Sequence, residues 1–379
     1  MTRKLHNIMV TGGAGFIGCN FIRYLFGMSA SEEAEFTDSG FDGRVVNVDA
    51  LTYAGNAASL DDINAVYGSG CAGSAGRRYF FEKADICDRA EVERILRQYD
   101  IDTIVHFAAE SHVDRSILGP EAFIRTNVLG TYTLLDAARQ FWGISLDKRR
   151  DDVLFHHIST DEVYGSLGET GYFTETTPYD PRSPYSASKA SSDHIAMAYH
   201  HTYGVPVTLS NCTNNYGPYQ FPEKLLPLMI LNIKEGKSLP VYGDGKNIRD
   251  WIYVEDHNRA VWQILRNGSA GQKYNIGGEN EWQNIRLLGK IIELTAEELR
   301  ISASDVQKTI SYVKDRPGHD RRYAIDCAKI KTELGWQRRM TFEQGLRLTV
   351  KWYLRNADWV ENIKSGEYLR WIDKNYTGR

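Results

Sequence analysis

Three consecutive side chains that carry oxygen, Thr160, Asp161 and Glu162, follow an apolar segment in the stretch HISTDEVYG. Successive side chains along a strand point to opposite faces, so one site could use all three only where the strand has ended and the chain turns. Two neighbouring carboxyl groups push each other's pKa values apart and so supply one acid and one base. The stretch therefore indicates acid–base chemistry at the end of a buried strand, with a solvated turn as the alternative interpretation.

A tyrosine and a lysine stand four residues apart in YSASK, as Tyr185 and Lys189, which places them one turn apart on the same face of a helix. A free tyrosine has a pKa of about 10 and is a poor base at neutral pH. A nearby ammonium favours the phenolate and can lower that pKa. The two could be surface side chains that share a helix face, but a dinucleotide-binding pattern upstream and Thr160 on the preceding strand favour a catalytic pair.

That upstream pattern is GGAGFIG, in which Gly12, Gly15 and Gly18 lie between an apolar strand-like segment and an apolar-periodic helix. Glycines at this place let the backbone turn tightly and approach a pyrophosphate at the helix N-terminus. Asp49 ends the next strand-like segment, after a polar insert, and is suited to the ribose hydroxyls. Because its carboxylate would repel a ribose 2′-phosphate, the pattern favours NAD over NADP.

Strand-like and helix-like patterns alternate through about the first 200 residues, which predicts an α/β fold with a Rossmann-like, doubly wound parallel sheet. After a strand, glycine turn and helix over 7–26, the expected strands are 44–50, 78–86, 102–111, 152–160 and 205–211. The expected helices are 88–99, 121–142 and 185–204. Polar inserts at 28–43 and 67–78 are typical of surface loops.

The alternation of strand-like and helix-like patterns ends after Cys212, which predicts a smaller C-terminal substrate-binding domain. We expect a dinucleotide-binding domain over 1–212, to which 248–278 returns, and a substrate domain built from 213–247 and 279–379.

Composition excludes several classes of protein. The 45 basic and 49 acidic residues give a net charge of −4, which does not favour a nucleic-acid surface. The five cysteines are scattered without a C-x-x-C pair, so a disulfide framework or a zinc site is not expected, and no other metal site is predicted. The N-terminus lacks the long apolar region of a signal peptide, and no apolar run approaches the roughly 18 residues of a membrane helix. A cytoplasmic location is therefore expected.

Beyond these local patterns, a set of longer motifs resembles a known family. The motifs are GGAGFIG, NVDALTYAGN, HFAAESHVDRS, STDEVYG, YSASK, NNYGPYQFPEKL, IRDWIYVEDH and DRPGHDRRYAID. They resemble the extended short-chain dehydrogenase/reductases that act on nucleotide sugars, and within that group are most similar to the dTDP-glucose 4,6-dehydratases. The resemblance runs from the first strand to about Gly335; one departure is Ala50, where the family usually has a lysine.

The resemblance implies an NAD-dependent hydro-lyase that forms dTDP-4-keto-6-deoxyglucose and water from dTDP-glucose, in deoxysugar biosynthesis such as that of rhamnose. It implies that Tyr185, beside Lys189, removes the 4-hydroxyl proton as hydride leaves C4, while Thr160 hydrogen-bonds the 4-oxygen. It also implies that Asp161 protonates the departing 6-hydroxyl and that Glu162 removes the C5 proton. The hydride then returns to C6 and Glu162 returns a proton to C5, so no net oxidation occurs.

Further contacts are carried over from the family by position. The implied cofactor residues are Gly12, Gly15, Phe16, Ile17, Gly18, Asp49, Leu51, Thr52, Asp85, Ile86, Phe107, Ala108, Ala109, Ser111, Thr126, Tyr185, Lys189 and Asn215. The implied substrate residues are Ser111, Thr160, Asn214, Lys224, Leu225, Pro240, Tyr242, Arg249, Asn284, Arg316 and His319. Arg249 and Arg316 are suited to diphosphate oxygens, although the second lies in DRPGHDRR, which could be an ordinary solvated loop. A homodimer through 121–139 and 191–204 is also implied.

Other functions stay open at this point. A C4-epimerase or decarboxylase of the same superfamily would share the glycines, Tyr185 and Lys189, but an epimerase needs no acid or base at C5 and C6. A catalytically inactive dinucleotide-sensing regulator would typically have lost the tyrosine or the lysine. A UDP-glucose 4,6-dehydratase is the nearest alternative, because the motifs do not distinguish thymine from uracil.

Overall fold

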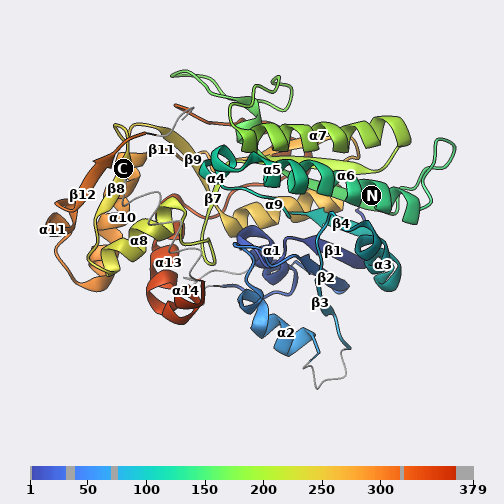
Figure 1. Cartoon of the computed structure of the whole chain (residues 1–379), viewed down its shortest axis with the longest axis horizontal. Helices are drawn as coiled ribbons and strands as arrows, with labels where there is room; N and C mark the ends of the chain where they lie inside the picture. Colours follow the sequence, from blue (N-terminus) through green and yellow to red (C-terminus); the bar gives the residue numbers. More distant parts are fainter. Residues whose placement is uncertain (1, 31–38, 70–75, 316–319, 364–379) are drawn as a thin grey trace.

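The computed structural model describes residues 2–30, 39–69, 76–315 and 320–363. Its centre is a seven-stranded sheet in the order β10-β6-β5-β4-β1-β2-β3, in which every pairing is parallel (Figure 1). The strands are β1 (Asn7–Thr11), β2 (Arg44–Asp49), β3 (Tyr79–Lys83), β4 (Thr103–His106), β5 (Leu154–Thr160), β6 (Val207–Cys212) and β10 (Lys273–Ile276). The order from β3 to β6 is that of a doubly wound dinucleotide-binding sheet, so the predicted fold class is confirmed.

Helices cover both faces of this sheet because side chains along each strand alternate between two apolar clusters. On β1, Ile8 and Val10 belong to one cluster and Met9 to the other. The first cluster includes side chains of α1 (Phe16–Leu25) and α9 (Val254–Asn267). The second includes side chains of α3 (Arg89–Tyr99), α6 (Thr131–Phe141) and α7 (Pro184–Tyr203). The parallel strands are thus buried on both sides.

A third apolar cluster is formed by the part of the chain after Cys212. It includes side chains from two smaller sheets and from the helices that pack on them. One sheet joins β7 (Asn214–Tyr216), β9 (Ile248–Tyr253) and β11 (Glu281–Gln283), and the other joins β8 (Leu239–Tyr242) and β12 (Ile310–Val313). Their helices are α8 (Leu225–Lys234), α10 (Asn284–Leu299), α11 (Ala303–Gln307), α13 (Phe342–Arg355) and α14 (Ala357–Ile363). This region lies at the opposite end of the long axis from α3 and α6 (Figure 1).

The segment 248–278 connects the two regions. Strand β9 pairs with β7 and β11 in the smaller sheet, whereas α9 contributes to the apolar cluster of α1, and β10 pairs with β6 in the main sheet. The division of the chain into two domains at the residues expected from the sequence stays a prediction.

The helix expected over 121–142 is interrupted. It begins as α5 (Pro120–Phe123), continues as a π-helical segment η2 (Ile124–Gly130), and returns to α-helix in α6. Within η2 the buried Asn127 accepts a hydrogen bond from the Glu110 backbone at 2.9 Å and donates one to Ser188 at 2.8 Å. Such segments are frequent at functional sites. Here Asn127 in the widened turn connects the segment after β4 to α7. These contacts join residues far apart in the chain, so no local sequence pattern predicts the π-helical segment.

The remaining elements are short or peripheral. They are η1 (Ala57–Leu60), α2 (Asp61–Tyr67), α4 (Val113–Leu118), η3 (Asp161–Tyr164) and α12 (Ala328–Leu334). The two polar inserts lie partly outside the described residues, at 31–38 and 70–75. Within the described ranges, no helix has both the length and the apolar character needed to cross a membrane.

Candidate active site

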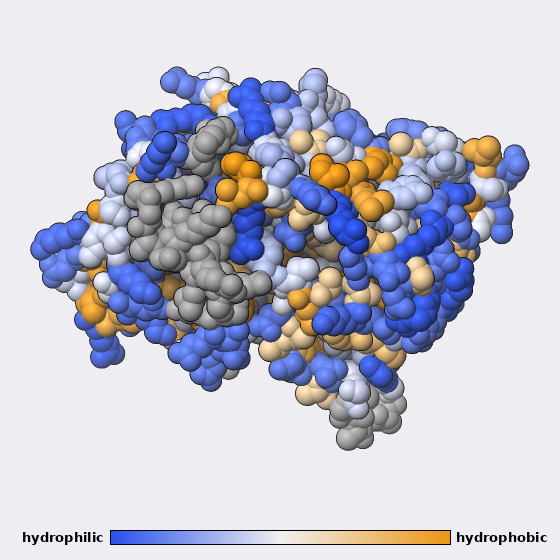
Figure 2. All heavy atoms as spheres, in the orientation of Figure 1, coloured by the Kyte–Doolittle hydropathy of each residue, from blue (hydrophilic) through white to orange (hydrophobic). Residues whose placement is uncertain are grey.

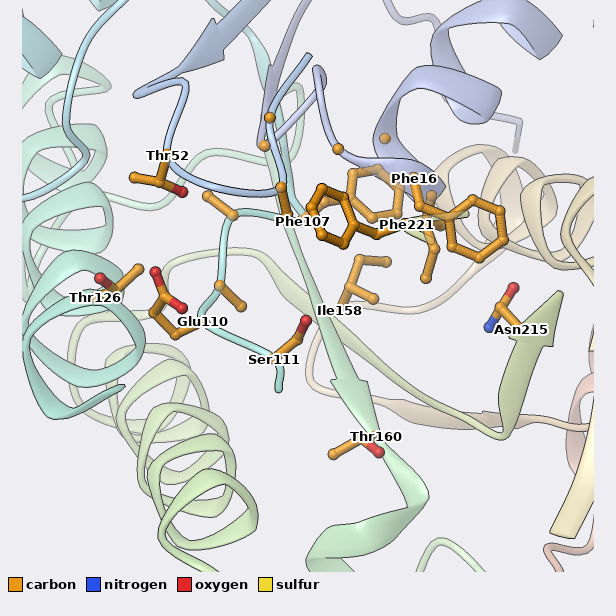
Figure 3. Close-up of a pocket in the computed structure, with 18 of the residues that line it drawn as sticks. Phe16, Thr52, Phe107, Glu110, Ser111, Thr126, Ile158, Thr160, Asn215 and Phe221 are labelled. Carbon is orange, nitrogen blue, oxygen red and sulfur yellow. The ribbon is translucent and has the colours of Figure 1, made fainter. Parts of the chain in front are cut away.

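A cavity of about 370 Å³ opens at the carboxyl ends of the central strands. Its lining comes from the β1–α1 turn, from the segments that follow β2, β3, β4 and β5, from the first turns of α7, and from 212–224. Figure 3 shows Thr52, Ser111, Thr160 and Asn215 around this space. Ligands of doubly wound sheets bind at this edge, where strand order reverses.

The β1–α1 turn forms one wall through backbone alone. Gly12 has a φ of +70°, and a Cβ placed there would lie 2.6 Å from the backbone nitrogen of Ala108. Gly15 is the N-cap of α1, without a side chain over the first helical amides. The turn therefore leaves the helix N-terminus open to an anionic group.

Asp49 joins β2 to that turn. Its Oδ2 accepts a hydrogen bond from the Ala14 amide at 2.9 Å, and its Oδ1 accepts one from the Leu51 amide at 2.8 Å. Burial raises the pKa of this carboxyl, while the two amides act in the opposite direction. Each oxygen keeps acceptor capacity toward the cavity, so the chain's own residues fit the ribose of a dinucleotide.

The stretch of Thr160, Asp161 and Glu162 turns where the sequence predicts it. β5 ends at Thr160, and the short helix η3 begins at Asp161. Thr160 caps this helix: its Oγ1 accepts from the Glu162 amide at 3.3 Å and lies 3.3 Å from Oδ1 of Asp161. All three residues line the cavity. Their use in one reaction stays a prediction.

Asp161 and Glu162 meet different surroundings. Asp161 is buried, and burial, followed by the nearby Glu162 and Asp250, raises its pKa well above the usual range, with Arg249 acting in the opposite direction. Its Oδ2 accepts no hydrogen bond from any described residue. Glu162 is only half-buried. The arrangement therefore favours a protonated Asp161 beside a more solvated Glu162.

Tyr185 and Lys189 lie in the first turns of α7, which begins with a capping box at Ser183. The Lys189 ammonium donates a hydrogen bond to the Ile158 carbonyl at 2.7 Å. The pKa of Tyr185 is raised well above its usual value, first by burial and then by Glu162, although hydrogen bonding with Thr160 lowers it. The protein groups alone therefore do not produce the lowered pKa expected from the sequence, because burial has the largest effect on this pKa.

Most of the expected cofactor residues line the cavity. They are Gly12, Gly15, Phe16, Ile17, Gly18, Asp49, Thr52, Asp85, Ile86, Phe107, Ala108, Ala109, Ser111, Thr126, Tyr185, Lys189 and Asn215. Leu51 is not among the lining residues; its amide is used by Asp49.

The expected substrate residues divide into three groups. Ser111, Thr160, Asn214 and Lys224 line the cavity. A second group lies in the described part of the chain but does not line the cavity: Leu225, Pro240, Tyr242, Arg249 and Asn284. Arg316 and His319 lie outside the described residues. The contacts of the last two groups with a substrate stay predictions.

Arg249 is held in place by its neighbours. Its guanidinium donates to the carbonyls of Ile248 at 2.7 Å and Asp320 at 3.0 Å, and lies 4.2 Å from the centre of the Tyr323 ring. It is buried and close enough to Asp161 to act on its pKa. Its predicted contact with a diphosphate stays a prediction.

Two acidic residues of the cavity wall were not singled out by sequence reasoning. Glu110 follows β4, and burial raises its pKa. Glu223 has a fully buried side chain that lies 3.5 Å from His112 and 3.4 Å from Arg115. A carboxylate near the end of the expected strand 102–111 was a usable signal for Glu110, whereas nothing local marks Glu223. No group of metal-ligating side chains was found among the described residues.

Comparison with known proteins agrees with this geometry. The family model described as GDP-mannose 4,6 dehydratase matches residues 9–349. The chain belongs to this family. Within it, the chain is 52% identical over 381 residues to the dTDP-glucose 4,6-dehydratase of Salmonella typhimurium, covering 98% of this chain and 99% of the relative. It is equally 52% identical to dTDP-glucose 4,6-dehydratase 1 of Escherichia coli K12, again over 98% and 99% of the two chains.

Solved structures of similar proteins superpose closely on this chain. The dTDP-glucose 4,6-dehydratase of Streptomyces venezuelae, crystallised with NAD and TYD, is 43% identical with a TM-score of 0.81, over 94% of this chain and 100% of that chain. A UDP-glucose 4-epimerase of Thermotoga maritima, crystallised with UDP-glucose, is 27% identical with a TM-score of 0.76, over 93% and 99%. The likeness is thus greater to the dehydratase than to the epimerase.

Proposed function

We propose that this protein is an NAD-dependent hydro-lyase that converts dTDP-glucose into dTDP-4-keto-6-deoxyglucose and water. The observation that carries the proposal is the meeting of two pairs in one cavity, Tyr185 with Lys189 and Asp161 with Glu162. The first pair suits oxidation of an alcohol, and the second suits elimination of water. The relatives reported above are named for this activity.

The order of the steps follows from the chemistry of the sugar. The C5 proton of a hexose is not acidic and its 6-hydroxyl is a poor leaving group. Once C4 is a ketone, C5 lies beside a carbonyl and the 6-hydroxyl lies beta to it, so an acid and a base can eliminate water. When bound, NAD would accept the hydride from C4, and the NADH so formed would return it to C6 while C5 regains a proton.

For the oxidation, we assign Tyr185 as the base that removes the 4-hydroxyl proton and Thr160 as the donor to the 4-oxygen. Because burial raises the pKa of Tyr185, the phenolate requires positive charge nearby. Lys189, one turn farther along α7, places an ammonium on that side of the cavity. Its hydrogen bond to the Ile158 carbonyl holds the ammonium against the end of β5.

For the elimination, we assign Asp161 as the acid and Glu162 as the base. The raised pKa of Asp161 keeps a proton available for the departing 6-hydroxyl, and its Oδ2 accepts no hydrogen bond from the described residues. The half-buried Glu162 can hold a carboxylate and remove the C5 proton. A C4-epimerase would need neither group, so this pair distinguishes the two activities.

The cavity also accounts for the expected cofactor. The glycine turn, which a Cβ at Gly12 would obstruct, would hold the pyrophosphate, and Asp49 would hold the ribose hydroxyls. A buried carboxylate at this position opposes a 2′-phosphate, which favours NAD. We assign Ser111, Asn214 and Lys224, which line the same cavity, to the sugar nucleotide.

The decisive experiment incubates the purified protein separately with dTDP-glucose and UDP-glucose and follows the 4-keto-6-deoxy product. We expect product from dTDP-glucose without added oxidant, because the hydride is returned in each cycle. Product only from UDP-glucose would change the assigned substrate. NADH that accumulates in step with product would contradict the closed hydride cycle.

We also propose a homodimer through 121–139 and 191–204. The support is a set of apolar side chains on the outer face of α4, η2 and α6: Ile117, Leu118, Ile124, Leu129 and Tyr132 are each 42–58% exposed. Hydrophobic residues gather over this part of the surface (Figure 2). Patches of this kind commonly mark sites where proteins associate.

A further inference from the structure

Asp193 is a buried carboxylate to which the mechanism above gives no role. It lies on α7, one turn after Lys189, and is 1% exposed. Its Oδ2 accepts hydrogen bonds from Ser159 at 2.7 Å and from the Tyr179 hydroxyl at 2.9 Å. Its Oδ1 lies 3.1 Å from Nε2 of His157. A buried carboxylate with several partners is costly to maintain, so its presence calls for a function.

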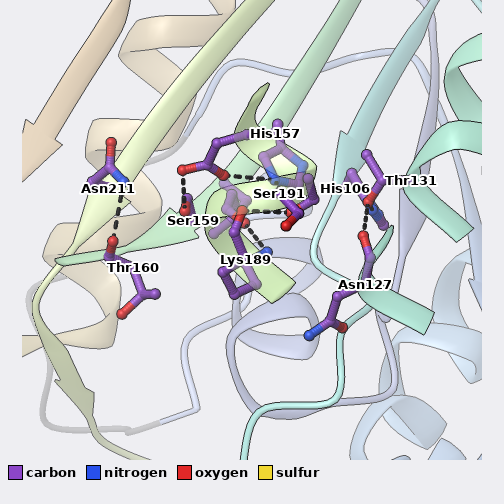
Figure 4. A network of polar contacts seen from close by, with 12 residues as sticks. His106, Asn127, Thr131, His157, Ser159, Thr160, Lys189, Ser191 and Asn211 are labelled. Atoms are coloured by element: carbon purple, nitrogen blue, oxygen red, sulfur yellow. Dashed lines mark hydrogen bonds and ion pairs between the residues drawn. The ribbon is translucent and has the colours of Figure 1, made fainter. Parts of the chain in front are cut away.

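Two of these partners belong to the strand that carries the catalytic residues. His157 and Ser159 lie on β5, and Ser159 directly precedes Thr160. Figure 4 shows His157, Ser159 and Lys189 in one polar network at this end of the strand. Asp193 therefore connects the helix that presents Tyr185 to the strand that presents Thr160.

The groups around Lys189 are otherwise uncharged near neutral pH. The titratable groups that interact with it are Asp193 on α7, Cys212 on β6, His157 on β5 and His106 on β4. Burial lowers the pKa of both histidines, and burial raises the pKa of Cys212 to about 12. Burial likewise lowers the pKa of Lys189, and Asp193 is the first group that opposes this effect. The geometry agrees with this pairing: the two residues lie one turn apart on α7, and their side chains bond neighbouring residues of β5, Lys189 the Ile158 carbonyl and Asp193 the Ser159 hydroxyl.

We propose that Asp193 is a positioning residue: its carboxylate is the countercharge that keeps the buried Lys189 ammonium charged beside Tyr185. Through its hydrogen bond with Ser159 it also fixes the end of β5. The proposal rests on the proposed function only for the role of Lys189 in oxidation. The electrostatic pairing itself can be tested without any turnover.

The first test replaces the charge while keeping the shape, with Asp193→Asn. Lys189 acts as an ammonium, so oxidation is lost as the pH rises through its pKa. Removing the countercharge lowers that pKa, and the alkaline limit of NADH formation in a single turnover with dTDP-glucose should move down by about 1 pH unit. NADH forms in the oxidation step, before the elimination in which Asp161 acts as the acid. Measuring NADH therefore separates the titration of Lys189 from that of Asp161.

Two variants serve as controls. Tyr179→Phe removes one hydrogen bond to the same carboxylate but leaves its charge, so the alkaline limit should stay in place. Asp256→Asn removes a different buried carboxylate, which pairs with Arg259 and accepts from the Met340 amide, and should lower stability without moving the limit. An unmoved limit in Asp193→Asn, or an equal shift in Asp256→Asn, would overturn the proposal.

A second test uses thermal unfolding of Asp193→Asn, Lys189→Met and the double variant. If the two charges are paired, Asp193→Asn should lower the melting temperature less in the Lys189→Met background than in the parent. Additive effects would overturn the pairing. If Asp193→Asn alone does not fold, the proposal requires the double variant to fold, and failure of both would contradict it. This result is independent of whether dTDP-glucose is the substrate.

Discussion

Asp161 and Glu162 are neighbours in the chain, yet their surroundings separate their chemistry. Asp161 is buried near Asp250, whereas Glu162 is half-buried at the cavity. A carboxyl group that is desolvated and close to other carboxylates holds its proton, and a more solvated one releases it. Adjacent side chains can therefore divide the work of acid and base within one elimination.

The first prediction separates oxidation from elimination. Asp161→Asn and Glu162→Gln keep size and remove the acid or the base, so each should still form some NADH on the enzyme while losing dehydration by about 10²–10⁴-fold. Tyr185→Phe should lose both steps. NADH absorbance and formation of the 4-keto-6-deoxy product measure the two steps separately.

Solvent deuterium entry at C5 provides the matching control, since it should fall most in Glu162→Gln. Dehydration at the parent rate in both carboxamide variants would show that these side chains are not the elimination machinery.

The second prediction concerns stability at neutral pH. The folded-state pKa of Asp161 is raised, so above the unfolded pKa of about 3.9 the folded chain retains a proton that the unfolded chain releases. This group therefore lowers stability progressively as the pH rises from the unfolded toward the folded pKa. Asp161→Asn should raise the melting temperature at neutral pH while dehydration is lost.

The gain in melting temperature should shrink as the pH approaches 4. It should be absent from the control Asp305→Asn, because Asp305 is an exposed residue on α11. A melting temperature that is lower than that of the parent at neutral pH would contradict this account.

At the scale of elements, the β1–α1 turn holds its shape because three backbone segments approach one another closely. The turn joins β1 to α1, the loop after β4 lies against it at Ala108, and Asp49 at the end of β2 accepts from Ala14 within it. Close backbone approach needs residues without a Cβ, which is why glycine spacing is informative here.

The third prediction follows from that approach. Gly12→Ala would place a Cβ 2.6 Å from the Ala108 nitrogen at a φ of +70°. The resulting strain of about 1–3 kcal/mol should displace the turn and weaken NAD binding, by about tenfold for each 1.4 kcal/mol. The NAD content of the purified protein measures this loss.

Gly168→Ala is the control for that substitution, because no described atom lies within 4 Å of a Cβ at that position and its φ is outside the left-handed region. Equal NAD content in the two variants would show that the turn tolerates a side chain.

On the scale of the whole molecule, the exposed apolar side chains of α4, η2 and α6 belong to elements that contact the cavity wall. η2 connects through Asn127 to Glu110 on the cavity wall and to Ser188 on α7. A partner seated on this face would thus support the helix that carries Tyr185 and Lys189.

The fourth prediction tests that partner as a second copy of this chain. Leu129→Asp introduces a charge among the exposed apolar residues, and its desolvation should raise the dimer dissociation constant by tenfold or more, about 1.4 kcal/mol. Sedimentation velocity over a range of concentrations measures the change. Leu146→Asp is the control, because Leu146 is 69% exposed and lies outside the proposed interface segments. A parent protein that is monomeric at all concentrations would contradict the dimer.

The sequence by itself determined those features that depend on neighbours along the chain. The glycine turn with Asp49, the pair Tyr185 and Lys189, and the stretch that begins at Thr160 each lie within one or two consecutive elements. Strand and helix periodicity likewise sufficed for the parallel sheet, because alternation of the two patterns allows few other folds. Local spacing carries this information, so residues that line the cavity could be named before the fold was known.

Only the tertiary structure decided the electrostatics of the site. The pKa of Asp161 is raised first by burial, then by Glu162 and then by Asp250 from β9. The environment of Lys189 depends on groups from β4, β5 and β6 as well as on its own helix. The raised pKa of Tyr185 and the buried Glu223 were likewise invisible in the sequence. Burial and Coulomb interactions sum over atoms that are close in space, and the chain brings these atoms together from segments that no sequence window contains.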